Sequence, residues 1–326
     1  MLDKSYEYYP CVNEGAKNLA CFAGSTEGCF RYYPYLEKLT KQFNVILFNY
    51  PGIGGMPLEE DYTVESIAER FLEILNSLKI DKFYAMGHSM GGFVGQRLAI
   101  EYPERIEKLV LVSTGFGSFA HTESFYNMVN FKEFGIKSVF SKDFVENHPE
   151  KVDAFIEDKK ERIESYFIAP RASLSTIFAG SRFSSFSELY KIKAETLVIH
   201  GIDDYVTDLK MGETMSKLID NSRILKLKSV GHYPLIEDDS TIDSVIDFMT
   251  EKAEVGELSN NSYVVSEDLL KMDKSFKKGV NTEEYTQTFR DIFIHKKYQK
   301  EEALHKYLSI VNKNDVEDDL YGIKSL

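Results

Sequence analysis

The sequence has few cysteines, no long apolar run and no basic cluster, and each absence excludes a class of protein. Its three cysteines (Cys11, Cys21 and Cys29) are an odd number without metal-type spacing, so we expect reduced thiols in or near the core and no metal or disulfide framework. No apolar run approaches the roughly 20 residues that span a bilayer, and the first residues lack a basic stretch followed by an apolar one. These features predict a cytoplasmic protein without a transmembrane segment.

Charge and composition narrow the class further. The 326 residues carry a net charge of −13, which repels phosphate backbones, and no run of Lys and Arg is interleaved with aromatic residues. We therefore expect no nucleic-acid partner. With 43% hydrophobic and 13% aromatic residues, the chain is an ordinary globular one, long enough for one sizeable core or two modest ones.

Short apolar runs alternate with segments of helical periodicity along most of the chain. Such alternation, with each strand apolar almost throughout, indicates a mostly parallel sheet covered by helices on both faces. The predicted strands are 18–23, 44–48, 82–86, 108–113, 195–200 and 223–227, and the predicted helices are 30–39, 63–78, 92–100, 209–219 and 240–252.

Two regions depart from this alternation. Residues 115–192 are helical and rich in phenylalanine without a convincing strand, and sheet elements flank them, so we expect a helical cap over the sheet edge. Most of its aromatic residues are expected to pack in a core. Residues 253–326 predict a C-terminal helical extension that either packs on the core or contacts a second copy or another protein. The α/β core is then 1–114 and 193–252.

The motif around which the chemistry is organised is Gly87-His88-Ser89-Met90-Gly91. It has the Gly-x-Ser-x-Gly pattern of a nucleophile elbow, in which a serine occupies a sharp turn between a strand and a helix. The turn brings strand and helix backbones together, so the flanking positions tolerate little beyond hydrogen. A plain glycine-rich turn is the alternative, but the predicted order of strand, elbow and helix favours the elbow.

A serine nucleophile needs a base and an acid that orients the base. His232 follows one predicted strand and Asp204 follows another, so both are expected at the carboxyl edge of the sheet. The order Ser89, Asp204, His232 is that expected for this fold. Spacing alone barely separates Asp204 from Asp203 and Asp208.

The remaining histidines are interpreted as structural. His88 is expected to point away from the side of the serine, and the others lie in a strand, in the inserted block or in the extension: His200, His121, His148, His295 and His305.

An acyl-transfer intermediate also needs two N–H donors for its oxyanion. The backbone N–H of Met90, directly after the nucleophile, is one candidate, since it begins a helix. The backbone N–H of Ser25, in the loop Gly24-Ser25-Thr26 after the first predicted strand, is the other, and a plain turn is the alternative there.

Together these residues resemble the α/β-hydrolase superfamily with a helical cap, the branch of esterases, lipases and thioesterases, over residues 15–252. The family's acid motif matches Gly201-x-x-Asp204, which favours Asp204, and its histidine loop matches Gly231-His232 followed by Glu237. The usual His-Gly of the oxyanion loop is Ala23-Gly24 here. The opening loop also resembles that of type II thioesterases.

The resemblance implies a serine hydrolase that cleaves a carboxylic ester or thioester, with no cofactor and no metal. The aromatic cap suggests a small-molecule substrate with an apolar acyl group. Two other functions stay open from the sequence: a slow-turnover or non-catalytic binding protein on the same fold, and an acyltransferase, because water and an alcohol compete for one acyl-enzyme.

Overall fold

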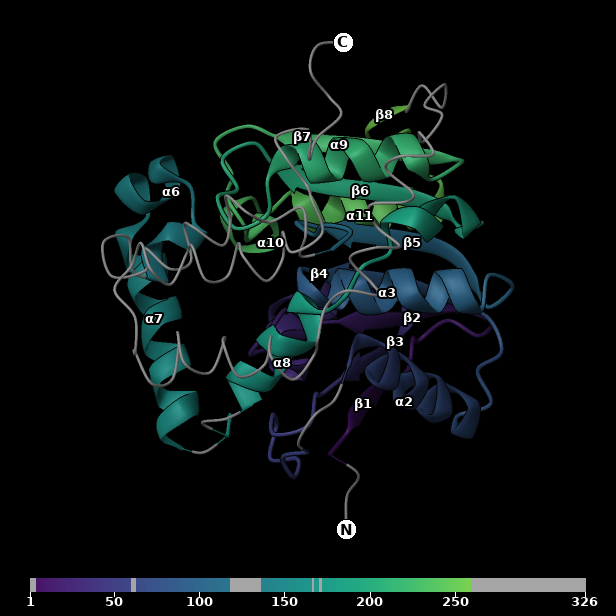
Figure 1. Ribbon diagram of the computed structural model, residues 1–326, viewed down its shortest axis with the longest axis horizontal. Helices are drawn as coiled ribbons and strands as arrows, with labels where there is room; N and C mark the ends of the chain where they lie inside the picture. Colours follow the sequence, from purple (N-terminus) through teal and green to yellow (C-terminus); the bar gives the residue numbers. More distant parts are fainter. Residues whose placement is uncertain (1–3, 60–62, 118–135, 166, 170–171, 259–326) are drawn as a thin grey trace, which may run out of the picture.

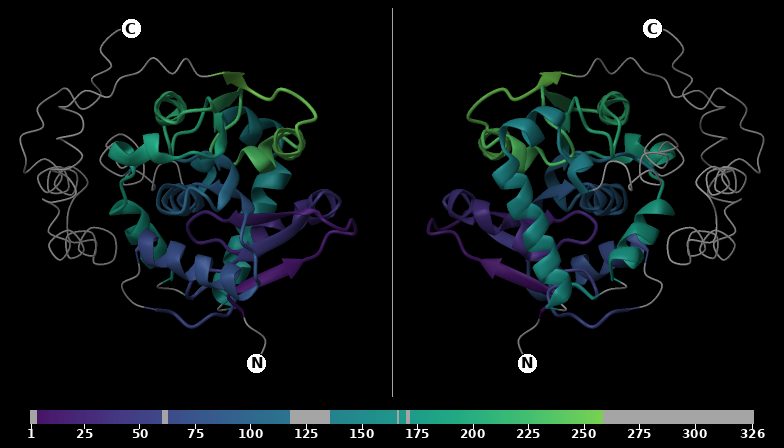
Figure 2. Two further views of the ribbon diagram at one scale, coloured as in Figure 1. Left: turned by 90° about the vertical axis from the view of Figure 1, so that its right-hand side faces the viewer. Right: turned by 90° about the vertical axis from the view of Figure 1, so that its left-hand side faces the viewer.

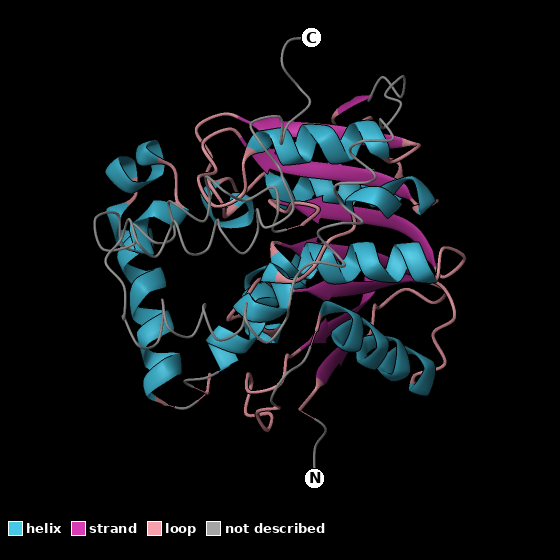
Figure 3. Ribbon diagram, in the orientation of Figure 1, coloured by secondary structure: helices cyan, strands magenta, loops and turns pink. Residues whose placement is uncertain are grey.

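A single eight-stranded sheet organises the computed structural model, which describes residues 4–59, 63–117, 136–165, 167–169 and 172–258. The strand order is β1-β3-β2-β4-β5-β6-β7-β8, with the middle six strands parallel and the two edge strands antiparallel to their neighbours (Figures 1 and 3). The strands are β1 (Tyr6–Tyr9), β2 (Lys17–Phe22), β3 (Phe43–Phe48), β4 (Phe83–His88), β5 (Ile106–Val112), β6 (Glu195–Gly201), β7 (Ser222–Leu227) and β8 (Glu257–Leu258).

All six predicted strands are present, and the two edge strands were not predicted. The inner strands β4, β5 and β6 are buried almost throughout, which explains why they appear in the sequence as continuous apolar runs. Strand β1 is only partly buried, and its four residues are three tyrosines and a glutamate, so it lacks that signal. Strand β8 has two exposed residues paired with β7.

Helices cover both faces of the sheet. Helices α2, α3 and α9 lie on one face and α11 on the other, and the 90° views separate the two layers (Figures 1 and 2). Helix α1 is tied to α11 by an ion pair between Lys38 and Asp243. These helices are α1 (Leu36–Thr40), α2 (Val64–Ser77), α3 (Met90–Glu101), α9 (Leu209–Leu218), α10 (Pro234–Glu237) and α11 (Thr241–Thr250).

Local chemistry determines where two of the helices begin. Thr63 caps α2 in a reciprocal capping box with Ser66, and Phe71 from that helix stacks on Phe48 of the sheet at 4.4 Å. The predicted helix 30–39 is divided: a 3-10 helix, η1 (Cys29–Tyr35), precedes α1. Pro34 lies inside η1, and because proline has no N–H it interrupts the α-helical hydrogen-bond series.

Between β5 and β6 the described part of the chain is helical. Its elements are η3 (Ile136–Val139), α6 (Lys142–Asn147), α7 (Pro149–Glu164), α8 (Ala172–Ser181) and η4 (Phe186–Lys191). Helices α6, α7 and α8 stand beside the sheet (Figure 1). An isolated bridge between Ile53 and Ile168 joins this segment to the loop after β3, so it contacts the carboxyl edge of the sheet.

The expected C-terminal extension falls almost entirely outside the described residues. Residues 253–258 lead into β8, and the helices expected beyond them, with the expected contact to a second copy or partner, lie in 259–326. Among the described residues, no helix combines the length and apolar character needed to cross a bilayer.

The three cysteines are unpaired, and their burial predicts their reactivity. Cys21 and Cys29 are buried and Cys11 is partly exposed. Burial raises the pKa of each of the Cys21 and Cys29 thiols well above the ordinary value for cysteine. The fraction of reactive thiolate at these two residues is therefore very small. We expect a disulfide exchange reagent at pH 8 to titrate one thiol rapidly in the native protein and three after denaturation. Rapid titration of three native thiols would contradict the packing described.

Candidate active site

The elbow adopts the strained turn that its glycines predicted. Strand β4 ends at His88, α3 begins at Met90, and Ser89 between them has φ 52° and ψ −119°. A Cβ on Gly87 would collide with the backbone of Gly91, four residues later. The side chain of Ser89 is therefore held at the point where strand gives way to helix, at the carboxyl edge of the sheet.

Substitution of Gly91 by alanine tests this close backbone packing directly. A Cβ there would meet the carbonyl oxygens of Phe22 and Ala23, backbone atoms that have no room to move aside. We expect Gly91→Ala to lower the free energy of unfolding by about 3 kcal/mol or more. In the matched control Gly180→Ala, the nearest atom lies 3.4 Å away on Phe93, an ordinary contact, so its stability should change little. Equal denaturation midpoints for the two variants would contradict the packing.

The structure brings Ser89, His232 and Asp204 together. His232 Nε2 lies 3.0 Å from Ser89 Oγ, and His232 Nδ1 lies 2.9 Å from Asp204 Oδ2. The three side chains come from the ends of β4, β6 and β7 and the loops that follow them. This linear series of contacts can move a proton from the serine hydroxyl to the imidazole while the carboxylate holds the ring.

Asp204 is oriented by its own loop. Its carboxylate accepts the backbone N–H groups of Val206 and Thr207 and the hydroxyl of Thr207. Burial alone would raise the pKa of Asp204, but the charge and hydrogen bonds of His232, with His200 and the Thr207 N–H, hold that pKa below its usual value. The group is therefore an ionised acceptor facing the Nδ1–H of His232.

The histidine loop is fixed by Glu237, the residue that the family resemblance marked. Its carboxylate accepts the backbone N–H groups of Gly231 and Ser141 at 2.9 Å each. The N–H of His232 in turn donates to the carbonyl of Val139 at 2.8 Å. Because Ser141 and Val139 belong to the segment between β5 and β6, that segment positions the loop that carries His232.

The two candidate oxyanion donors, the N–H groups of Ser25 and Met90, lie in the loop after β2 and at the start of α3. Glu27 N–H donates to Gly24 O, which closes a turn around Ser25, and among the described residues no acceptor binds the Ser25 N–H. Met90 is the first residue of α3, so its N–H has no acceptor within the helix. The tight contact of Gly91 with Phe22 and Ala23 brings the start of α3 against the start of the Ser25 loop.

The other described histidines are not part of the Ser89, His232 and Asp204 arrangement. His88 does not turn wholly away from it: its Nε2–H donates to the carbonyl of His232 at 2.8 Å, and the two rings lie 5.0 Å apart. His200 donates its Nε2–H to Thr207 O, and burial lowers its pKa. His148 caps neither flanking helix with its side chain and is exposed. His121, His295 and His305 lie outside the described residues.

Three residues that contact the site were not found from the sequence: Thr207, whose hydroxyl donates to Asp204, and the ion pair of Glu27 and Lys159, which adjoins the turn around Ser25. Thr207 carries a weak signal, since an aspartate side chain in a loop often accepts backbone N–H groups a few residues further on, as Asp204 does here. Glu27 and Lys159 carry none, because an isolated charged residue in a loop or on a helix is ordinarily solvated.

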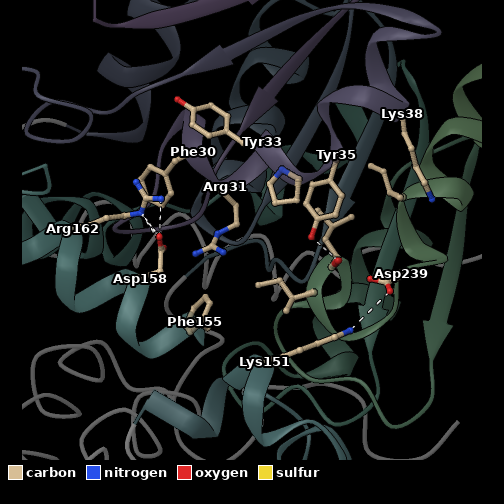
Figure 4. Close-up of a pocket in the computed structure, with 14 residues that line it drawn as sticks. Phe30, Arg31, Tyr33, Tyr35, Lys38, Lys151, Phe155, Asp158, Arg162 and Asp239 are labelled. Atoms are coloured by element: carbon tan, nitrogen blue, oxygen red, sulfur yellow. Dashed lines mark hydrogen bonds and ion pairs between the residues drawn. The ribbon is translucent and has the colours of Figure 1, made fainter. Parts of the chain in front are cut away.

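A pocket of about 690 Å³ lies between η1, α7 and α10 (Figure 4). Arg31 and Phe155 line it side by side, with the guanidinium 4.9 Å from the centre of the ring, and Tyr35, whose hydroxyl donates to the carbonyl of Leu235, lines it too. None of Ser89, Asp204 and His232 is among its lining residues. Among the described residues, no group of three or more His, Cys, Asp or Glu side chains gathers as a metal site would require.

A strand-elbow-helix serine aligned with a histidine and an aspartate, on a mostly parallel sheet, defines the class of α/β hydrolases. Comparison with family models agrees: the model of the alpha/beta hydrolase fold matches residues 19–239. The chain belongs to this family.

Its relatives include named hydrolases. It is 28% identical over 272 residues to 2-hydroxy-6-oxononadienedioate/2-hydroxy-6-oxononatrienedioate hydrolase 1 of Pseudomonas putida, covering 76% of this chain and 93% of that protein. It is 26% identical over 242 residues to the uncharacterized hydrolase YugF of Bacillus subtilis, covering 70% and 86%. Its fold resembles that of MGS-M2, an α/β hydrolase from a deep-sea metagenome library (TM-score 0.66, 17% identity, covering 77% and 94%).

Proposed function

We propose that the protein is a serine hydrolase that cleaves a carboxylic ester or thioester through an acyl-enzyme on Ser89. The observation that carries the proposal is the alignment of Ser89 Oγ, His232 and Asp204 at 3.0 and 2.9 Å. Serine hydroxyls are weak nucleophiles alone, and an imidazole within hydrogen-bond reach is what activates them.

In the first half-reaction, Ser89 Oγ attacks the carbonyl carbon while its proton passes to His232 Nε2. Asp204 stabilises the imidazolium that forms and keeps the ring in its productive orientation. The backbone N–H groups of Ser25 and Met90 hold the oxyanion, and the positive end of the α3 dipole favours the same negative charge. His232 then protonates the leaving alcohol or thiol.

In the second half-reaction, His232 removes a proton from water, which attacks the acyl-enzyme. The tetrahedral intermediate collapses, the free acid leaves, and Ser89 recovers its proton. An alcohol in place of water would give acyl transfer by the same steps.

The segment between β5 and β6 is proposed to act as a cap that receives an apolar acyl group. Its described aromatic residues Phe140, Phe144 and Phe155 pack with Tyr233, the neighbour of His232. Phe93 of α3 stacks on Phe183 of the same segment at 4.9 Å. These side chains are buried and hold the segment against the elbow and the His232 loop, so an acyl group that enters between them would meet apolar surroundings, which favour a hydrocarbon chain.

A panel of p-nitrophenyl esters and acyl thioesters of increasing chain length tests the proposal. Each added methylene that enters an apolar pocket contributes about 0.8 kcal/mol, or about fourfold in kcat/KM. We expect kcat/KM to rise with chain length until the pocket is filled, and Ser89→Ala to lower turnover by about 10⁵-fold or more. The panel also includes an oxo-dienedioate, the class of compound for which the Pseudomonas putida relative is named. Hydrolysis of a C–C bond can then be detected as one of the outcomes.

Three results would contradict the proposal. Turnover retained in Ser89→Ala would place the chemistry elsewhere. Cleavage of the oxo-dienedioate without cleavage of any ester or thioester would assign a different reaction. Tight binding of acyl compounds without turnover of any of them would favour the binding-protein alternative.

A further inference from the structure

Glu27 forms a buried charge cluster directly behind the active site. Its side chain is 0% exposed. Arg31 Nη2 lies 2.7 Å from Glu27 Oε1, and the hydroxyl of Tyr233 donates to the same oxygen at 2.9 Å. Lys159 Nζ, from α7, lies 3.8 Å away. A carboxylate fully removed from water is costly unless it is paired and hydrogen-bonded, so these four side chains must be held together.

The cluster is in contact with two of the loops that build the site. On the oxyanion side, Lys159 Nζ lies 3.8 Å from Glu27 Oε1 and donates to the hydroxyl of Thr26, in the turn around Ser25. On the base side, Glu27 Oε2 lies 3.8 Å from Nδ1 of His88, whose Nε2–H donates to the carbonyl of His232. Tyr233 is the next residue after His232. The carboxylate therefore reaches the oxyanion turn through Lys159 and the base loop through His88 and Tyr233.

The proposed cap contributes to the same turn. Lys159 Nζ donates to the hydroxyl of Thr26 at 2.9 Å, and the N–H of Thr26 donates to the hydroxyl of Thr176 from α8. Thr26 has φ 67°, a left-handed conformation that costs a β-branched residue energy unless its surroundings hold it there. Two helices of the β5–β6 segment supply that restraint.

The charges in the cluster favour an ionised Glu27. Burial would raise its pKa, but Arg31 foremost, with His88 and Lys159, holds that pKa well below its usual value. Burial lowers the pKa of Lys159, and the charge of Glu27 opposes that effect. Arg31 separates Glu27 from the pocket of Figure 4, which it lines, and its guanidinium lies over Phe155 and Tyr233. Among the described residues, these side chains surround the carboxylate and leave none of its surface exposed.

We propose that Glu27 is a positioning residue: relative to Ser89, it fixes the His232 loop through Tyr233 and His88 and the Ser25 turn through Lys159. The inference rests on the proposed function, because its effect is on the serine hydrolysis described above. It differs from a plain structural role in one respect, since it predicts a loss in kcat that depends on Tyr233.

A double-mutant cycle in kcat and KM tests this inference. Glu27→Gln keeps the shape and an acceptor oxygen but removes the charge, and Tyr233→Phe removes only the hydroxyl that reaches Glu27. A catalytic group displaced by about 1 Å loses about 100-fold in rate, so we expect kcat of Glu27→Gln to fall about 10- to 100-fold with KM within about twofold. Tyr233→Phe should lose less, and the double variant no more than Glu27→Gln alone, because both changes break one connection.

The matched control is Tyr9→Phe, which also removes a tyrosine hydroxyl bonded to a glutamate, here Glu7, but on the edge strand β1. It should leave kcat unchanged. Multiplicative losses in the double variant, or wild-type kcat in either single variant, would overturn the inference. If Glu27→Gln does not fold, Tyr233→Phe decides alone, because it adds no unpaired charge to the core.

Failure of the proposed function is recognised separately, as absence of turnover by the wild type. The inference is then decided by crystal structures of the wild type and Glu27→Gln. It predicts that the Gly24–Glu27 turn shifts or that the 3.0 Å contact between His232 and Ser89 opens. Unchanged loops in the variant would overturn it.

Discussion

Replacement of Ser89 or His232 by alanine is expected to lower kcat by about 10⁵- to 10⁶-fold, the largest effect of any substitution considered. Each change removes one end of the 3.0 Å contact through which the hydroxyl is activated. The double variant should lose no more than either single one, because nucleophile and base act as a unit. Single-turnover and steady-state assays on the best ester of the panel measure all three.

The same variants should remain folded. Ser89→Ala removes one partly exposed hydroxyl, so its thermal midpoint should stay near the wild-type value. His232 is buried, and its removal leaves the Asp204 carboxylate with only the donors of Val206 and Thr207, so the midpoint of His232→Ala should fall by a few degrees. A residual rate above the uncatalysed one is expected from the oxyanion donors alone. An alanine variant at either position that retains a tenth of the wild-type kcat would exclude the proposed mechanism.

Asp204→Asn is expected to lower kcat by about 10⁴-fold without unfolding the protein. Asparagine fills the same space but presents an N–H₂ group where the carboxylate faces His232 Nδ1, so the imidazole is stabilised in the wrong tautomer. It also cannot stabilise the imidazolium that forms as Ser89 attacks.

Asp203→Asn is the matched control for that substitution. Asp203 is adjacent in sequence and was an open alternative from spacing alone, yet His232 contacts Asp204. The control should retain wild-type kcat. If Asp203→Asn were the inactive variant, or if both were active, the assignment of the acid would be wrong.

Much of the fold was predictable because its signals are local. The Gly-x-Ser-x-Gly pattern marks a turn in which strand and helix backbones pack too closely for a side chain at the flanking positions. Gly87 and Gly91 occupy those positions in the structure. The inner parallel strands β4, β5 and β6 are buried on both faces and so stand out as apolar runs. The family resemblance and the mostly parallel sheet covered by helices are confirmed by the family match and the topology.

What the sequence did not reveal depends on contacts between distant residues. Glu27 resembles a solvated loop acid until Lys159 and Tyr233, more than 130 positions later, are brought beside it. The strands β1 and β8 depend on pairing with β3 and β7 and have little apolar pattern of their own. The cap boundary and the roles of Ser25 and Met90 stay predictions.

Labelling with a fluorophosphonate serine probe, read by intact mass, tests the central claim most directly. An activated serine beside a histidine reacts with such a probe regardless of which acyl group the enzyme prefers. We predict one adduct per chain in the wild type, none in Ser89→Ala and strongly slowed labelling in His232→Ala. Absence of an adduct in the wild type, or an adduct that persists in Ser89→Ala, would contradict the account.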